Sequence, residues 1–314
     1  MDTSARIPFK RSRHEIYEPA QRLPFHVGDM RPIMFCGTGS DVGKSTLATA
    51  VCRILRQDGL HPAPFKAQNM APYYRLTEDG KQVARAQAVQ AEAAGISPTT
   101  DMNPLLLIPQ GDHTSEVILN GTSLGCKTAM QLYREDDRSI LRQQIFAAFD
   151  RLKDIYAPII MEGAGSVSEL NLQRQDLVNM PMAAYADAAV ILVADIDRGG
   201  VFASCYGSIK LQTPENQKRI KGIVINKFRG DGRLFEDGKR MLEELCGVPV
   251  LGVIPYYHHI VIEEEDTLRG NTPDNELLEN ASFRERQYDL LADHVRKYLD
   301  IEALKVLMKN KEDM

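Results

Sequence analysis

Residues 37–46 read Gly-Thr-Gly-Ser-Asp-Val-Gly-Lys-Ser-Thr, and this run strongly constrains what the chain can fold into. An apolar segment, Ile33–Cys36, leads into it, and a helix-like segment, Leu47–Leu55, follows. Strand, glycine-rich turn and helix in this order are typical of a phosphate-binding loop, where backbone N–H groups and the positive end of the helix dipole meet one anion. The run therefore predicts a nucleotide triphosphate site.

The loop departs from the strict pattern Gly-x-x-x-x-Gly-Lys-Ser/Thr, because its first glycine is one residue early and Thr38 stands where that pattern has glycine. We expect Lys44 to place its charge against the outer phosphates of ATP and the Ser45 hydroxyl to ligate Mg²⁺. The alternative is an ordinary glycine-rich turn that caps a helix. The expected nucleotide-binding residues of the loop are Gly39, Ser40, Asp41, Val42, Gly43, Lys44, Ser45 and Thr46.

Apolar strand-like runs alternate with helical patterns through most of the chain. The expected strands are Ile33–Cys36, Pro62–Phe65, Ile159–Met161, Ala189–Ala194, Ile220–Ile225 and Val250–Ile254. The expected helices are Leu47–Gln57, Val83–Ala94, Ile140–Ile155, Phe202–Leu211 and Phe235–Cys246. Continuous apolar strands separated by helices predict an α/β fold, with a mostly parallel sheet covered on both faces. The stretch from Met102 to Tyr133 predicts a strand-rich excursion at the edge of that sheet.

Composition excludes several classes of function. The net charge of −5 offers no broad basic surface for nucleic acid, and no apolar run approaches the roughly 18–20 residues of a membrane span. The first thirty residues lack the apolar core of a secretory signal. The five cysteines are scattered without a Cys-x-x-Cys pair, which indicates reduced thiols in a cytoplasmic protein.

Five expected strands end in polar or small residues, and ligands of open parallel sheets bind beyond the carboxyl ends of the strands. These strand ends are Gly37, Lys66–Asn69, Glu162–Gly165, Asp195–Gly200 and Asn226–Lys227. Glu162 is well placed there to hold Mg²⁺, directly or through water. Asp195 and Asp197 compete for the same role, and only the glycines beside Glu162 favour it; a helix-capping acid is the simpler alternative.

The remaining polar residues of this rim suggest contacts to substrate or nucleotide. Lys66 could neutralise charge on a transferring phosphoryl group, and an ordinary surface lysine is the alternative. Gln68 and Asn69 are neutral donors that could orient a polar ligand. Arg198 could contact an anion or form a surface ion pair, and Asn226 could recognise the base or form a turn. His258 and His259, close to four acidic residues, are interpreted as part of a solvated loop.

Several blocks together resemble the cobyric acid synthase family, over about Pro32 to Asp266. They are residues 37–46, 64–70, 85–93, 101–104, 161–166, 195–202 and 225–231. The synthetase domain of that family is similar to dethiobiotin synthetase. The phosphate loop of dethiobiotin synthetase also has one more residue between its first glycine and the Gly-Lys pair than the strict pattern. The resemblance therefore implies a P-loop NTPase-like fold and explains the irregular loop spacing.

The resemblance implies a reaction as well. ATP phosphorylates side-chain carboxylates b, d, e and g of the corrinoid adenosylcobyrinic acid a,c-diamide, and ammonia displaces each phosphate to give an amide. Carried over by motif, Lys44 and Ser45 hold the phosphates and Mg²⁺, and Glu162 binds Mg²⁺. Lys66 steadies the transferring phosphoryl group and Asn226 reads adenine. The substrate side is expected to include Gln68, Asn69, Asp195, Asp197 and Arg198.

Members of that family continue into a glutamine amidotransferase domain, and the sequence after Asp266 does not match it. The resemblance thus implies a synthetase domain over residues 31–268, an N-terminal extension over 1–30, a polar linker over 269–280 and a helical tail over 281–314. None of the cysteines lies in a nucleophile-elbow context, so we expect no glutaminase activity in this chain. Nitrogen would come from ammonia or a separate glutaminase subunit.

Two other functions stay open from the sequence. A nucleotide switch of the MinD/ParA kind would have a second lysine near the start of the loop, where Thr38 and Gly39 stand. A degenerate paralogue would bind nucleotide or corrinoid without turnover, against which Lys44, Lys66 and Glu162 argue. The expected partners are the corrinoid and a separate glutaminase, without nucleic acid or membrane, and a homodimer is compatible with the sequence.

Overall fold

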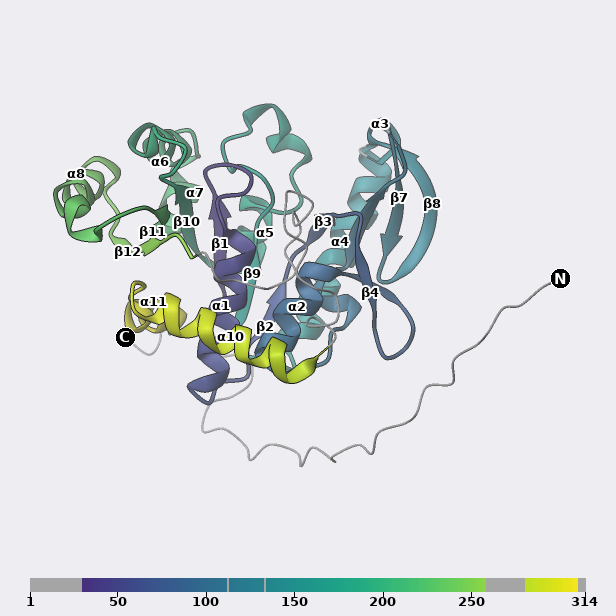
Figure 1. Ribbon diagram of the computed structural model, residues 1–314. Coiled ribbons are helices and arrows are strands. Elements are labelled where there is room, and N and C mark those ends of the chain that lie inside the picture. The colour runs from purple at the N-terminus through teal and green to yellow at the C-terminus, as the bar shows by residue number, and fades with distance from the viewer. Residues whose placement is uncertain (1–29, 112, 133, 258–279, 310–314) are drawn as a thin grey trace.

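A computed structural model describes residues 30–111, 113–132, 134–257 and 280–309 (Figure 1). The sequence predictions for residues 1–29 and 258–279 fall outside the described residues. They concern the N-terminal extension, the polar linker and the loop that begins at His258 and His259.

Six parallel strands form the central sheet, and they confirm the predicted fold class. In spatial order they are β12 (Val250–Pro255), β11 (Ile220–Phe228), β10 (Ala189–Asp195), β1 (Ile33–Gly37), β9 (Ile159–Glu162) and β2 (Ala63–Phe65). Each corresponds to a predicted strand. The strand β1, which leads into the phosphate loop, lies between β10 and β9, so the ends of these three strands are neighbours at one rim.

Helices cover both faces of this sheet. Alternate residues of its strands point to opposite sides, and on both sides they are apolar and buried. One core contains Phe35 and the other contains Met34, and both side chains are fully buried. Packed on the Phe35 side are α1 (Lys44–Gln57), α2 (Arg85–Ala94), α10 (Ala281–Arg296) and α11 (Ile301–Met308). Packed on the Met34 side are α4 (Glu135–Lys153), α5 (Met180–Tyr185), α6 (Val201–Lys210) and α8 (Glu236–Cys246), while α7 (Pro214–Arg219) leads into β11. Among the described residues, no helix is long and apolar enough to cross a membrane.

The helix α10 packs against α1 and crosses in front of α1 and α2 in the view of Figure 1. Arg53 of α1 contacts Glu285 and Asp289 of α10, each at 2.7 Å. Arg284 of α10 contacts Glu92 of α2 at 2.6 Å. The segment predicted as a helical tail contains two helices, α10 and α11. Ion pairs as well as apolar packing attach α10 to the helices that follow β1 and β5.

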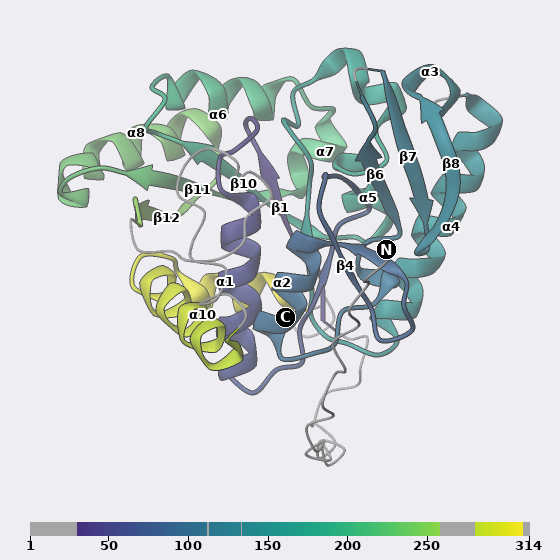
Figure 2. The same ribbon diagram turned by 45° about the vertical axis from the view of Figure 1, so that its right-hand side comes forward.

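A second, four-stranded sheet stands beside the first (Figure 2). It contains β3 (Gln68–Met70), β6 (Leu105–Pro109), β7 (Thr114–Leu119) and β8 (Thr122–Thr128), followed by the short helix α3 (Ala129–Leu132). The predicted excursion therefore forms a sheet of its own and does not extend the edge of the central one. A hairpin of β4 (Tyr74–Leu76) and β5 (Gln82–Ala84) also corrects the predicted start of α2, because Val83 and Ala84 are paired with β4.

Candidate active site

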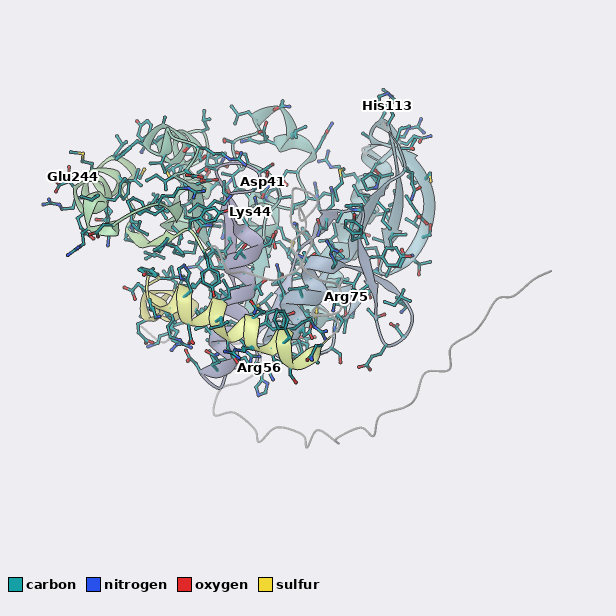
Figure 3. The ribbon with its side chains drawn as sticks, viewed as in Figure 1. Asp41, Lys44, Arg56, Arg75, His113 and Glu244 are labelled. Carbon is teal, nitrogen blue, oxygen red and sulfur yellow. The ribbon has the colours of Figure 1, made fainter. Side chains whose placement is uncertain are left out.

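The phosphate loop joins the end of β1 to the start of α1. The helix begins at Lys44, three residues before its predicted start. Its N-cap, Gly43, provides no side-chain cap, and the first turn contains no acidic residue. Backbone N–H groups at this end therefore have no side-chain acceptor from the cap, and the helix dipole favours an anion there. Figure 3 shows Asp41 and Lys44 at this end of α1 and Arg56 at the other.

Two glycines of the loop are required by close packing. A Cβ atom on Gly37 would lie 2.6 Å from the carbonyl oxygen of Gly39 and 2.9 Å from Nζ of Lys44. Gly43 has φ +96°, and a Cβ atom there would lie 2.1 Å from Nδ2 of Asn226. Both contacts are shorter than side chains permit. The early glycine that breaks the strict motif is thus one that this loop geometry needs.

The loop after β9 is bound to the phosphate loop. Lys44 Nζ donates to the carbonyl oxygens of Gly39 at 3.1 Å and Gly165 at 3.0 Å. The Ser166 hydroxyl donates to the carbonyl oxygen of Thr38 at 3.0 Å. The ends of two predicted strands, β1 and β9, are therefore held together by hydrogen bonds around the lysine that we expect to contact phosphate.

Four side chains meet at the end of β9, and we call them the buried carboxylate cluster: Ser45, Lys66, Gln90 and Glu162. Oε1 of Glu162 accepts hydrogen bonds from Ser45 Oγ at 2.7 Å and Lys66 Nζ at 3.0 Å. Oε2 accepts from Gln90 Nε2 at 2.7 Å. The side chains of Glu162 and Lys66 are 1% and 4% exposed, so this ion pair is almost wholly shielded from water.

The charge of Glu162 is maintained by its neighbours. Burial by itself would raise its pKa, but the Lys66 ammonium and the hydrogen bonds from Ser45, Gln90 and Lys66 outweigh burial. The pKa of Glu162 therefore lies below its usual value, and the side chain is a carboxylate at neutral pH.

Two asparagines hold the backbone around this cluster. Asn103 Nδ2 donates to the carbonyl oxygen of Lys66 at 3.0 Å. The amide of Asn179 accepts from the N–H of Ala164 and donates to its carbonyl oxygen, both at 3.0 Å. Sequence reasoning assigned a role to neither residue, nor to Gln90. Asn103 and Gln90 do lie in blocks that carry the family resemblance, whereas no local signal marks Asn179.

The carboxylates that compete with Glu162 in the sequence have different surroundings. We call this group the arginine-paired cluster: Asp195, Asp197, Arg198, Lys227 and Arg229. Asp195 contacts Lys227 at 3.1 Å and Arg198 at 3.4 Å. Asp197 contacts Arg229 at 2.6 Å, which lowers the pKa of Asp197. The side chain of Asp195 is 4% exposed, whereas those of Arg198 and Arg229 are 58% and 52% exposed, so the arginine side of this cluster faces solvent.

Of the other predicted site residues, Asn226 and Arg198 contact the phosphate loop, whereas Asn69 contacts α2. Asn226 Nδ2 donates to the carbonyl oxygen of Val42 at 2.9 Å, which places this amide beside the phosphate loop. Arg198 contacts Asp41 of that loop at 3.3 Å. Gln68 and Asn69 lie on β3, where Asn69 is buried and donates to Gln87 of α2 at 2.9 Å. Recognition of adenine by Asn226 and of substrate by Asn69 stay predictions.

The chemistry of the buried carboxylate cluster fits Mg²⁺. No group of three or more His, Cys, Asp or Glu side chains lies together within the part of the chain that the structure describes. Mg²⁺ commonly takes one or two carboxylates, keeps several waters and uses phosphate oxygens for the rest. Glu162 and Ser45 offer two adjacent oxygens next to the phosphate loop, and the carbonyl oxygen Oε1 of Gln90 is buried without a partner.

Comparison with known proteins identifies the region that contains both clusters. Residues 33–268 match the family model described as "CbiA: CobQ/CobB/MinD/ParA nucleotide binding domain". This range includes the phosphate loop, the buried carboxylate cluster and the arginine-paired cluster.

Individual relatives carry the name cobyric acid synthase. The protein of Phocaeicola vulgatus is 65% identical over 240 residues, 76% of this chain and 48% of that protein. A Bacteroides fragilis protein is 63% identical over 244 residues, 78% of this chain and 49% of its own length. One from Limosilactobacillus reuteri is 48% identical over 282 residues, which are 88% of this chain and 54% of that protein. The chain thus spans about half the length of these curated relatives.

Proposed function

The chain belongs to the CobQ/CobB/MinD/ParA nucleotide-binding domain family, and from this we propose that it uses ATP and Mg²⁺ to amidate corrinoid carboxylates in cobalamin biosynthesis. The proposed substrates are the b, d, e and g carboxylates of adenosylcobyrinic acid a,c-diamide. Relatives named cobyric acid synthase, 48–65% identical, support this substrate class. The observation that carries the proposal is the 2.7 Å contact between Ser45 of the phosphate loop and the buried Glu162.

Each residue of the site has a part in this chemistry. Lys44 and the N–H groups at the start of α1 bind the phosphates. Ser45 and Glu162 hold Mg²⁺, which when bound neutralises phosphate charge as phosphoryl transfer proceeds. Lys66, whose ammonium lies 3.0 Å from Glu162, stabilises the negative charge of the transferring group. The protein works mainly by positioning and charge neutralisation.

The substrate carboxylate is the nucleophile in the first step. One of its oxygens attacks the γ-phosphorus of ATP, the bond to the β,γ-bridging oxygen breaks, and ADP leaves with that electron pair. Ammonia then attacks the carbonyl carbon of the acyl phosphate. Inorganic phosphate departs with the original carboxylate oxygen, the nitrogen loses a proton, and an amide remains. No side chain of the enzyme needs to form a covalent bond.

The nitrogen is proposed to come from ammonia, free or released by a separate glutaminase. Glutamine hydrolysis by an amidotransferase needs a reactive cysteine thiolate. Burial raises the pKa of Cys36 and Cys205 to about 12 and also raises the pKa of Cys52 and Cys246. Cys126 is exposed on β8, in the sheet beside the central one. The four buried thiols are therefore poor candidates for a glutaminase nucleophile.

The test is an amidation assay with the whole chain, ATP, Mg²⁺ and the a,c-diamide. With ammonium chloride we expect ADP and corrinoid amides in equal amounts, detected by mass spectrometry. With glutamine in place of ammonium chloride we expect neither. Nucleotide binding without any amide from ammonium chloride would contradict the proposal and favour a paralogue that binds without turnover.

A further inference from the structure

Gln90 is a fully buried amide that contacts the proposed metal-binding carboxylate from a different element. It lies on α2, and its Nε2 donates to Oε2 of Glu162 at 2.7 Å. Ser45 and Lys66 both contact the other oxygen, Oε1. Gln90 is therefore the group that fixes the second oxygen of the carboxylate and, with it, the orientation of the whole group.

The other end of the same amide has no partner. Oε1 of Gln90 is buried and accepts no hydrogen bond. Leaving a buried acceptor unpaired is unfavourable, so such atoms in native proteins usually meet a water or a ligand. A leucine or methionine would fill the same volume without this cost, which indicates that the amide is suited to something that binds there.

We propose that Gln90 positions Glu162 for Mg²⁺ and that its free carbonyl oxygen accepts a hydrogen bond from a water of the bound ion. The inference rests on the proposed function. Mg²⁺ keeps several of its waters, and each is a strong hydrogen-bond donor. One amide can serve both purposes, because its NH₂ group orients the carboxylate and its oxygen accepts a hydrogen bond from the water. Groups that hold metal ligands in this way typically change metal affinity by about 10–100-fold.

Gln87 provides a matched control. It lies one turn earlier on α2, is equally buried, and has an amide atom, Nε2, without a partner. Its Oε1 accepts from Asn69 instead of contacting Glu162. Replacement of either glutamine by methionine removes a buried amide from the same helix face, but only the Gln90 variant removes a contact to the carboxylate.

The experiment measures the dissociation constant of the β,γ-imido analogue of ATP by calorimetry, with Mg²⁺ and in EDTA. For the parent chain we expect Mg²⁺ to tighten binding. In Gln90→Met this Mg²⁺-dependent gain should fall by about tenfold or more, while affinity in EDTA stays unchanged. Gln87→Met should retain the parent gain. Gln90→Asn, which keeps an amide but shortens its reach, should behave like Gln90→Met and serves if that variant does not fold.

Each other outcome overturns the inference. A parent-like Mg²⁺ gain in both Gln90 variants would show that Gln90 does not support the metal, and would leave the proposed function intact. Equal losses in the Gln87 and Gln90 variants would show a packing effect of α2. Absence of any Mg²⁺ effect in the parent chain would reject the proposed metal site together with the inference.

Discussion

The two carboxylate clusters both lie at the ends of buried parallel strands, yet Glu162 and Asp197 differ in burial and in their partners. Glu162 is 1% exposed and receives a lysine, a serine of the phosphate loop and a glutamine. Asp197 pairs with an arginine that is half-exposed. A guanidinium already satisfies its carboxylate, whereas the buried carboxylate cluster retains an unpaired acceptor beside a phosphate loop. Position at a strand end therefore does not by itself distinguish the two clusters; the partners of their acids do.

The largest expected effect follows from removing the charge of Glu162. In Glu162→Gln we expect amidation to fall by about 100-fold or more, because a preorganised charge at the reacting phosphate is lost. The measurement is ADP and amide formation with ammonium chloride at saturating Mg²⁺. Glu169→Gln, an exposed acid in the segment after β9, is the control and should keep parent rates. Parent rates in Glu162→Gln would refute its role in catalysis.

The stability of the buried ion pair gives the second prediction. Glu162→Gln leaves Lys66 charged without its carboxylate, which should lower the free energy of unfolding by about 3–5 kcal/mol. Adding Lys66→Met should recover most of this loss but no activity, because replacement of both partners removes the unpaired charge. Urea unfolding of both variants checks this. Additive losses in the double variant would show that the two residues do not form a coupled pair.

Neutralising an acid of the arginine-paired cluster should change stability and nucleotide binding much less. Asp197→Asn removes a largely solvent-exposed ion pair with Arg229, and such pairs contribute little to stability. We expect no resolvable change in thermal unfolding and no change in the Mg²⁺ dependence of nucleotide binding. In Glu162→Gln, by contrast, nucleotide binding should lose its Mg²⁺ dependence. The same loss in Asp197→Asn would mean that the metal role had been assigned to the wrong cluster.

The smallest effect is expected in the titration of Asp197. The hydrogen bond from Arg229 lowers the pKa of this carboxyl below its ordinary 3.8. Its stabilising contribution is thus present above pH 3.8 and lost as the pH falls through the lowered value. Arg229→Gln should raise the pKa of Asp197 toward 3.8, measured from its carboxyl ¹³C shift. An unchanged pKa would show that the pair is not formed in solution.

Sequence patterns predicted the central sheet because its strands are short, continuous apolar runs, such as Ala189–Ala194, that alternate with helical patterns along the chain. The rule that ligands bind beyond strand ends also selected Glu162, the last residue of β9, and Lys66, which follows the neighbouring parallel strand β2. The four-stranded sheet was not predicted as separate, because β3 contains only the polar Gln68 and Asn69 and the exposed Met70.

The partners of the site residues were harder to predict than their positions. Gln90 contacts a residue 72 positions away, and only the orientation of α2 brings them together. Asn179 likewise lies in a segment without a motif. Its side-chain amide binds the backbone of Ala164, fifteen positions earlier in the chain. Local patterns identify which residues end strands, whereas hydrogen bonds between elements depend on packing that short-range sequence does not encode.

Transfer of oxygen from substrate to phosphate tests the central claim most directly. The chain would be incubated with ATP, Mg²⁺, ammonium chloride and an a,c-diamide whose remaining carboxylates carry ¹⁸O. Because each activated carboxylate gives up an oxygen with the departing phosphate, we predict one ¹⁸O in inorganic phosphate for every amide formed. Amides accompanied by unlabelled phosphate would contradict activation of a substrate carboxylate at this phosphate loop.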